Sequence, residues 1–255
     1  MERAEWLKKW RGMAEALYDH GAPAYWVKFG MYPDPPHHQF IEKFLGRLGA
    51  HSAILDAACG AGLYDGILLE AGHSVLGIDQ SGGMLARARE HYPQERFPEL
   101  RYAKIGLQEM DFQATFDGVI CMDALEHICP EDWPGIVANF HKALRQGGAL
   151  YVTVDALKLP GDAKAYERAK AMGLPVVFGE VVDELDEVYS LAMGMEAVEA
   201  ASIGERLDLS VYHYHPSMEQ VRTWFDQAGL AIEEEVTEEE GTGEGYVHVL
   251  ARKKV

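Results

Sequence analysis

The segment Ala53–Gly62 constrains the fold of this 255-residue chain more than any other. Its sequence, AILDAACGAG, is an apolar run that ends in an acid and leads to Gly60 and Gly62. Such a run predicts a buried strand, a tight turn and the start of a helix. A second apolar run, Ser74–Asp79, again ends in a carboxylate. Because glycines allow a close backbone approach and a terminal acid accepts hydrogen bonds from ribose hydroxyls, the two runs predict a site for an adenosine-containing cofactor.

Downstream of this segment, short apolar stretches alternate with helix-like ones. The predicted strands lie at 54–56, 74–79, 100–105, 116–122 and 150–154, and the predicted helices at 63–71, 82–91 and 132–144. Such alternation is typical of a parallel sheet covered on both faces. A predicted helix at 217–228 then precedes strands at 230–236 and 246–252. We therefore predict an α/β fold with a Rossmann-like, doubly wound, mostly parallel seven-stranded sheet and a C-terminal antiparallel hairpin.

Residues 1–50 differ in character from the core, which we place at 51–155. Helical periodicity is visible over 7–17. A glycine-, proline- and aromatic-rich segment, 21–36, is expected to be irregular, and a helix is expected over 37–48. We interpret this region as an N-terminal helical cover.

Residues 156–210 interrupt the alternation before 211–255 complete the sheet. The segment includes a predicted helix at 163–171 and another around 185–200. Long inserted elements commonly cover binding sites, so we expect an inserted lid and substrate region at the ligand edge. A packed helical arm with only a stabilising role is the alternative.

Composition narrows the class of protein. A formal net charge of -18 argues against nucleic-acid binding, which needs clustered basic residues. Three cysteines without a metal-binding or redox spacing suit a reducing compartment. The N-terminal residues lack the apolar core of a signal peptide, and no apolar run reaches membrane-spanning length. We expect a cytoplasmic protein with neither nucleic acid nor a membrane as partner, and the oligomeric state stays open. The glutamates at 233–235 and 238–240 are interpreted as a solvated face.

The glycine turn fits two cofactors. A nicotinamide dinucleotide site would have a third glycine where Asp65 stands, and a carboxylate there would repel a pyrophosphate. S-adenosylmethionine has no phosphate and carries a sulfonium cation, so a carboxylate such as Asp56 favours its binding. The residues favour S-adenosylmethionine, with S-adenosylhomocysteine as product.

The pattern Asp56-x-Ala58-x-Gly60-x-Gly62 resembles the D/E-x-G-x-G-x-G turn of class I S-adenosylmethionine-dependent methyltransferases, of the small-molecule methyltransferase-domain type (11/25-like). Ala58 replaces the first glycine of that turn. Further motifs in the same order are similar to the family at residues 77–88, 108–121, 124–128 and 144–150. The resemblance covers about 54–154 together with the C-terminal helix and strands.

The resemblance implies which residues bind each part of the cofactor. These are Tyr25, Asp56, Ala58, Gly60 and Gly62 at the methionine part, Asp79 at the ribose, Gln80, Met84, Leu107 and Gln108 at the adenine, and Cys121, whose main chain faces the methionine amine. Tyr25 is preferred over Tyr18 as the tyrosine at the methionine end. The structural alternative is that Asp56 and Asp79 only cap the turns that follow them. Gly106 stands where the family often has an aspartate, which leaves the adenine amine to Gln108, Glu109 or water.

Methyl transfer needs a base only if the acceptor must lose a proton, and histidine is the natural candidate near neutral pH. His127, which follows the fourth predicted strand, is a candidate base or a structural support. The alternating segment 211–216 places His213 and His215 on one strand face, where they are further candidates. A packed strand with satisfied side chains is the alternative. No clustered metal ligands are visible, so no metal is expected.

We therefore predict a methyltransferase that acts on a small-molecule acceptor, with oxygen, nitrogen and carbon acceptors left open. The alternatives are an NAD(P)-dependent Rossmann oxidoreductase and a non-catalytic S-adenosylmethionine-binding protein. Calorimetry with S-adenosylmethionine and NAD would distinguish the two enzyme classes.

Overall fold

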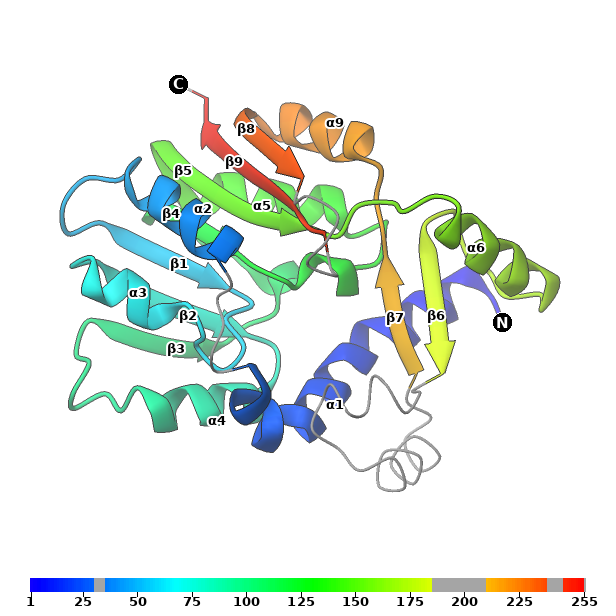
Figure 1. The fold of residues 1–255 in the computed structure, drawn as a ribbon, viewed down its shortest axis with the longest axis horizontal. Coiled ribbons are helices and arrows are strands. Elements are labelled where there is room, and N and C mark those ends of the chain that lie inside the picture. The colour runs from blue at the N-terminus through cyan, green and yellow to red at the C-terminus, as the bar shows by residue number, and fades with distance from the viewer. Residues whose placement is uncertain (30–34, 185–209, 238–244, 255) are drawn as a thin grey trace.

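The computed structural model describes residues 1–29, 35–184, 210–237 and 245–254 (Figure 1). Its main sheet comprises β1 (Ala53–Ala57), β2 (Ser74–Asp79), β3 (Leu100–Lys104), β4 (Phe116–Cys121), β5 (Leu144–Val154), β8 (Leu230–Thr237) and β9 (Val247–Lys253). The strand order is β3-β2-β1-β4-β5-β9-β8. The pairs among β1 to β5 are parallel, and β9 pairs antiparallel with both β5 and β8. The predicted sheet and its hairpin are confirmed.

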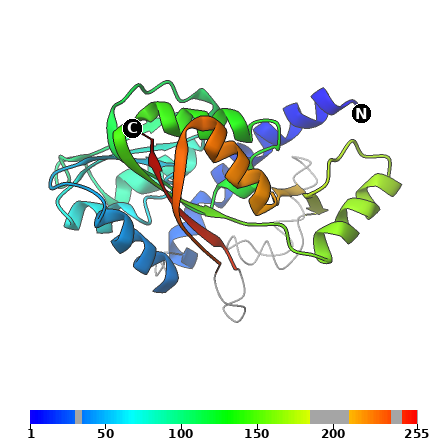
Figure 2. The ribbon, with the colours of Figure 1, turned by 90° about the horizontal axis from the view of Figure 1, so that it is seen from above.

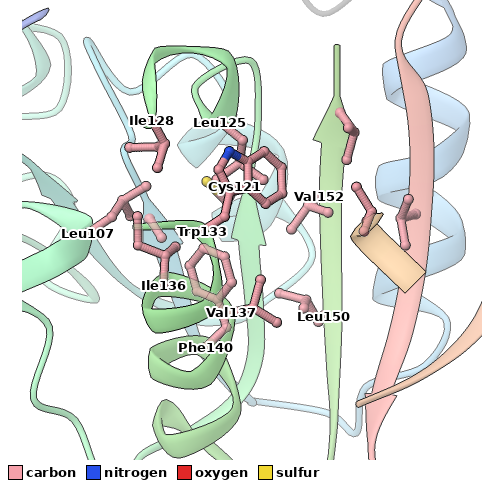
Figure 3. Close-up of a cluster of buried hydrophobic side chains, with 14 of the residues drawn as sticks. Leu107, Cys121, Leu125, Ile128, Trp133, Ile136, Val137, Phe140, Leu150 and Val152 are labelled. Atoms are coloured by element: carbon pink, nitrogen blue, oxygen red, sulfur yellow. The ribbon is translucent and has the colours of Figure 1, made fainter. Parts of the chain in front are cut away.

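Helices cover both faces of this sheet. α2 (Pro35–Leu45) and α3 (Asp65–Glu70) pack on one face, and α5 (Trp133–Ala143) and α9 (Met218–Ala228) pack on the other (Figure 2). α4 (Gly82–His91) lies against β2 and β3. On α5, Trp133, Ile136, Val137 and Phe140 share one helical face and are buried against β4 and β5 (Figure 3). This spacing is the apolar stripe of an amphipathic helix, which explains why α5 was predictable.

α1 (Arg3–Phe29) corrects one prediction, because the segment expected to be irregular is helical up to Phe29. Gly21 and Pro23 are weak helix formers, and they produced the wrong prediction. Packing against α4 stabilises this part of α1 although its residues have low helix propensity. Trp26 stacks on His91 of α4 with ring centroids 3.7 Å apart, and such packing outweighs propensity.

A smaller antiparallel sheet lies beside α1. It comprises β6 (Glu180–Glu184) and β7 (Ser210–Tyr214), and α6 (Gly161–Ala171) packs against β6 (Figure 1). The helix predicted around 185–200 falls outside the described residues. None of the described helices is both long enough and apolar enough to cross a bilayer.

Buried Glu180 joins the small sheet to α1. Its carboxylate accepts hydrogen bonds from the Arg3 guanidinium at 2.6 Å, the Trp6 indole at 3.2 Å and the Tyr212 hydroxyl at 2.7 Å. The backbone N–H of Val177 is a fourth donor at 2.6 Å. A buried carboxylate with this many donors is stable only while they stay in place, so Glu180 fixes α1 to β7.

Candidate functional site

A cavity of about 800 Å³, counted with its open mouth, lies at the carboxyl ends of β1, β2 and β4. Small-molecule sites span about 300–1,000 Å³, and in open α/β sheets they occur at this edge. Its wall includes Tyr25, Ala58, Gly60, Asp79, Gln80, Met84, Leu107, Gln108 and His127, all predicted from the sequence. The predicted residues Asp56, Gly62, Cys121, His213 and His215 are described but do not belong to this wall.

The turn after β1 is shaped by positive φ angles. They are 63° at Ala58, 54° at Gly60 and 82° at Gly62. A Cβ atom at Gly60 would lie 3.2 Å from the terminal methyl of Met84, so only glycine leaves this part of the cavity open. Ala58 adopts a left-handed conformation that is strained for a residue with a side chain. The sequence showed the missing glycine at Ala58, and the structure shows that the backbone there still has the conformation glycine prefers.

Asp79 connects this turn to the end of β2. One carboxylate oxygen accepts from the backbone N–H of Gly60 at 2.9 Å, and the other accepts from that of Ser81 at 2.7 Å. Burial raises the pKa of Asp79, while the two backbone donors act against that rise. Each oxygen retains a lone pair for a further donor, so the group can hold a ligand hydroxyl. Its place on the cavity wall fits the predicted ribose contact.

Asp56 and Asp65 lie together beneath the turn. Both are fully buried, and apart from the neighbouring Asp65 carboxyl no hydrogen-bond partner among the described residues reaches either oxygen of Asp56. The Tyr102 hydroxyl donates to Asp65 at 2.5 Å. Burial raises the pKa of Asp65 to about 6, and it also raises the pKa of Asp56 well above its usual value, with the neighbouring Asp65 carboxyl as the next cause. Both carboxylates therefore lie behind the backbone of the glycine turn. The sequence analysis had instead placed the Asp65 carboxylate beside the ligand.

Tyr18 of α1 and His127 meet at the cavity wall. The Tyr18 hydroxyl lies 2.8 Å from His127 Nε2, and His127 Nδ1 lies 3.4 Å from the backbone carbonyl of Tyr212. Since a carbonyl only accepts, Nδ1 carries the hydrogen and Nε2 accepts from Tyr18. Burial lowers the pKa of His127 to about 4, so the imidazole is neutral at neutral pH. The tyrosine preferred from the sequence was Tyr25, and it also lines the cavity.

The other two candidate histidines have different surroundings. The His213 ring lies 5.0 Å from the His127 ring, and burial lowers the pKa of His213 to about 3. His215 lies 3.2 Å from an Asp155 oxygen and 3.1 Å from one of Asp162. Although burial acts against it, these carboxylates raise the pKa of His215. His213 therefore lies beside His127, whereas His215 connects Asp155, which follows β5, to Asp162 of α6.

Asp123 is a cavity residue that sequence reasoning missed. Its carboxylate accepts from the Tyr64 hydroxyl at 2.6 Å and from the Thr153 hydroxyl at 3.0 Å, and His37 Nε2 lies 3.0 Å away. Its backbone is left-handed, with φ of 49°. These partners come from distant parts of the chain, and only its place after β4 was visible in the sequence.

These features define an α/β protein with a ligand site at the carboxyl edge of a parallel sheet, built around a glycine turn and a ribose-type acid. Residues 54–148 match the family described as "Methyltransferase domain". Over this region the chain is similar to class I S-adenosylmethionine-dependent methyltransferases.

Curated relatives and solved structures agree with this assignment. The ubiquinone biosynthesis O-methyltransferase of Coxiella burnetii is 26% identical over 186 residues, which cover 72% of this chain and 75% of the relative. A methyltransferase of that name from Acinetobacter baylyi is 29% identical over 120 residues, covering 46% and 49%.

Two solved structures show the same fold. An S-adenosylmethionine-dependent methyltransferase from Methanosarcina mazei has a TM-score of 0.65 at 17% identity and covers 88% of this chain and 99% of that one. The 1,6-didemethyltoxoflavin-N1-methyltransferase of Burkholderia thailandensis, with bound 1,6-didemethyltoxoflavin and S-adenosylhomocysteine, has a TM-score of 0.60 at 17% identity and covers 96% of this chain and 90% of that one.

Proposed function

We propose that this protein transfers a methyl group from S-adenosylmethionine to an uncharged small-molecule acceptor that carries a hydroxyl group. The observation that carries this proposal is the hydrogen bond between the Tyr18 hydroxyl and neutral His127 at the wall of the cofactor cavity. It provides a proton acceptor beside the place where the methyl donor binds.

The cavity suits the donor. Asp79 is oriented by two backbone donors and can accept from the ribose, and Leu107 and Gln108 would border the adenine. The open backbone at Ala58 and Gly60 leaves room for the methionine part. Asp56, Gly62 and Cys121 would support this site from behind its wall. When bound, S-adenosylmethionine supplies an electrophilic methyl group on a sulfonium cation.

Tyr18 and His127 can together remove the proton of the acceptor hydroxyl through two linked proton transfers. Tyr18 Oη accepts the proton of the acceptor hydroxyl while its own hydrogen passes to His127 Nε2, which leaves an acceptor oxygen with an unshared pair and an imidazolium. The Tyr212 carbonyl then receives a stronger hydrogen bond from charged Nδ1–H, which stabilises the imidazolium. His213, whose ring lies 5.0 Å from that of His127, would support the imidazole from outside the cavity wall.

The described residues of the cavity wall include no basic side chain apart from neutral His127. The wall does include Asp123, whose pKa, although burial acts against this, is lowered by its hydrogen bonds with His37 and Tyr64. Burial raises the pKa of Glu126 to about 8, so this acid is largely protonated at neutral pH, and His127 and His213 are neutral. None of the described residues in the cavity wall is a lysine or arginine. An anionic acceptor would lose its hydration without a compensating cation. An uncharged acceptor is therefore favoured, and the names of the O-methyltransferase relatives support an oxygen acceptor.

The remaining regions take supporting roles in this proposal. We assign 1–50 and 51–155 to the donor, the inserted segment 156–210 to the acceptor and 211–255 to the sheet, and of the inserted segment 185–209 lie outside the described residues. The three cysteines are free and buried, which supports a reducing, cytoplasmic location. The net charge of -18 supports a partner other than nucleic acid.

A test combines binding with a survey of acceptors. The protein is incubated with S-adenosylmethionine and a panel of uncharged phenols and alcohols, and released S-adenosylhomocysteine is measured. Tyr18→Phe and His127→Asn should each lower kcat by roughly 10²-fold or more, because the proton acceptor is lost. Tyr214→Phe is the matched control, because the Tyr214 hydroxyl contacts Gln220 outside the cavity wall. Binding of NAD without binding of either sulfur ligand would overturn the proposal.

The pH profile gives a second readout. An unperturbed histidine base would lose activity below about pH 6.5, where it becomes protonated. Here burial holds the pKa of His127 at about 4. At saturating donor, kcat should therefore stay constant from about pH 8 down to about pH 5.5. A decline centred near pH 6.5 would contradict the assignment of His127.

A further inference from the structure

Asp56 and Asp65 form an unusual pair beneath the glycine turn. Asp56 is 1% exposed at the end of β1, and Asp65 is 0% exposed at the start of α3. The turn between them forms part of the cavity wall through Ala58 and Gly60. A Cβ atom on Gly62 would lie 2.8 Å from an Asp65 oxygen, so that carboxyl directly contacts the turn. The two acids therefore lie under the donor site, separated from it by backbone.

Their surroundings hold no compensating charge. Asp56 faces the Asp65 carboxyl and, farther away, Asp79 and Cys121. Among the residues that the structure describes, no lysine, arginine or histidine forms an ion pair with these two acids. Besides Asp56, Asp65 interacts with the hydroxyl of Tyr102, which donates to it, and with the side chains of Tyr92 and Cys59. Two buried carboxylates in contact cannot both be ionised without a large cost, so they share one proton.

We propose that Asp56 and Asp65 share one proton in the free protein and release it to solvent when S-adenosylmethionine binds, so that the pair favours the methyl donor over the product. This inference rests on the proposed donor site. The step is the ionisation of one carboxylic acid, and the leaving proton goes to solvent or buffer. No residue has to move, because the pair and the cavity share the same turn.

The charge of the two ligands explains the preference. S-adenosylmethionine has an ammonium, a carboxylate and a sulfonium and is a net cation, whereas S-adenosylhomocysteine lacks the sulfonium charge. A cation at the turn stabilises the doubly ionised pair through a medium of low dielectric. Since the product brings no net charge, it leaves the proton in place and binds less tightly. The pair would therefore help the product to dissociate after transfer.

Calorimetry measures the proton directly. Each ligand is titrated into the protein at pH 6.5 in phosphate and in a buffer of high ionisation enthalpy, and the difference in heat gives the protons released. We expect S-adenosylmethionine to release a measurable fraction of a proton and S-adenosylhomocysteine a much smaller one. The affinity of the donor should also rise with pH, by up to about tenfold per unit, while that of the product stays flat. Equal heats in both buffers for the donor would overturn the proposal.

Two variants locate the effect. In Asp65→Asn the amide donates to Asp56, which is then ionised in the free protein. Proton release should vanish, and the ratio of donor to product affinity should no longer rise with pH. Tyr102→Phe removes the donor to Asp65 but keeps both acids, so release should persist. Asp226→Asn, an exposed acid on α9, is the control and should behave as the parent protein does.

The outcomes separate this inference from the proposed function. If neither sulfur ligand binds, the donor site itself is wrong. If both bind with equal affinity and no proton is released, the donor site stands and the coupling fails. Thermal unfolding of each variant confirms that it is folded. If Asp65→Asn is folded and still releases the proton, then the pair is not its source, and the proposal fails.

Discussion

Two groups of acidic residues in this protein meet opposite conditions. Asp56, Asp65 and Asp79 surround the glycine turn, are buried or nearly so, and have no cation among their described partners. Glu233 and Glu234 on β8 each contact two basic side chains, and Glu235 pairs with Arg222 at 2.5 Å. The first group has no counter-charge of its own, and the second is neutralised within the fold.

The difference bears on what each group can do. The carboxylates of β8 hold α2 and α9 to the edge of the sheet, since Lys43 and Arg47 come from or directly follow α2 and Arg222 comes from α9. The acids at the turn gain hydrogen bonds but no counter-charge from the described residues, so a cationic ligand would relieve them. Local density of acids does not distinguish the two groups, but burial and partners do.

The largest expected effect concerns Glu180, because its carboxylate is buried like those of the first group and has a basic partner like those of the second. Glu180→Ala removes four hydrogen bonds and leaves Arg3, Trp6 and Tyr212 without this acceptor. We expect a loss of about 3–5 kcal/mol in the free energy of unfolding, measured by urea denaturation. Glu131→Ala removes the exposed partner of the same arginine and should cost less than about 1 kcal/mol. Equal losses would show that burial does not matter here.

Asp65 gives the next largest effect, and it depends on pH. In the unfolded chain Asp65 loses its proton near 3.8, whereas in the folded protein burial holds its pKa at about 6. The folded state binds the extra proton, so stability falls as pH rises from about 4 to about 6, by roughly 3 kcal/mol. Asp65→Asn lacks this titration, so its stability relative to the parent should increase over the same interval. Parallel curves of unfolding free energy against pH would refute a buried, shared proton.

The sequence was sufficient where the signal is local. The apolar run before Gly60 and the stripe from Trp133 to Phe140 determine a strand and a helix from neighbouring residues alone. It was misleading at Gly21 and Pro23, where contact between Trp26 and His91 keeps α1 helical. That contact joins residues far apart in the chain, so no local pattern contains it.

In the candidate site too, some residues were predictable from local sequence and others were not. Asp79 and Gly60 were predictable because the turn and the end of β2 follow a fixed local geometry, and the two residues are hydrogen-bonded. The Tyr18–His127 pair spans 109 positions, and the sequence offered His127 as a candidate base and Tyr18 as the less preferred tyrosine, but not their pairing. The pairing of Asp56 with Asp65 was also hidden, since each acid was visible but their shared burial was not.

Asp79 tests the ligand side of the comparison. Asp79→Asn replaces one acceptor oxygen with an amide that opposes a backbone donor of Gly60 or Ser81. We expect the affinity for S-adenosylmethionine to fall by about 1–3 kcal/mol, seen by calorimetry. The exposed Asp111→Asn is the matched control and should bind normally. An unchanged affinity in Asp79→Asn would mean that the ribose is held elsewhere.

The ion pairs of β8 provide the smallest effect. Arg47 contacts both Glu233 and Glu234, and its guanidinium is largely shielded. Arg47→Gln should lower the free energy of unfolding by less than about 1 kcal/mol, because water and side-chain entropy offset most of an ion pair at the surface. Salt screens such pairs, so the difference from the parent protein should disappear near 0.5 M NaCl, a condition well above physiological ionic strength. The pH-dependent difference of Asp65→Asn, in contrast, should survive the same salt, because screening hardly reaches a buried pair. If salt removed both differences, the two groups of acids would share one environment, and the distinction between an unpaired group that attracts a ligand and a paired group that holds the fold would fail.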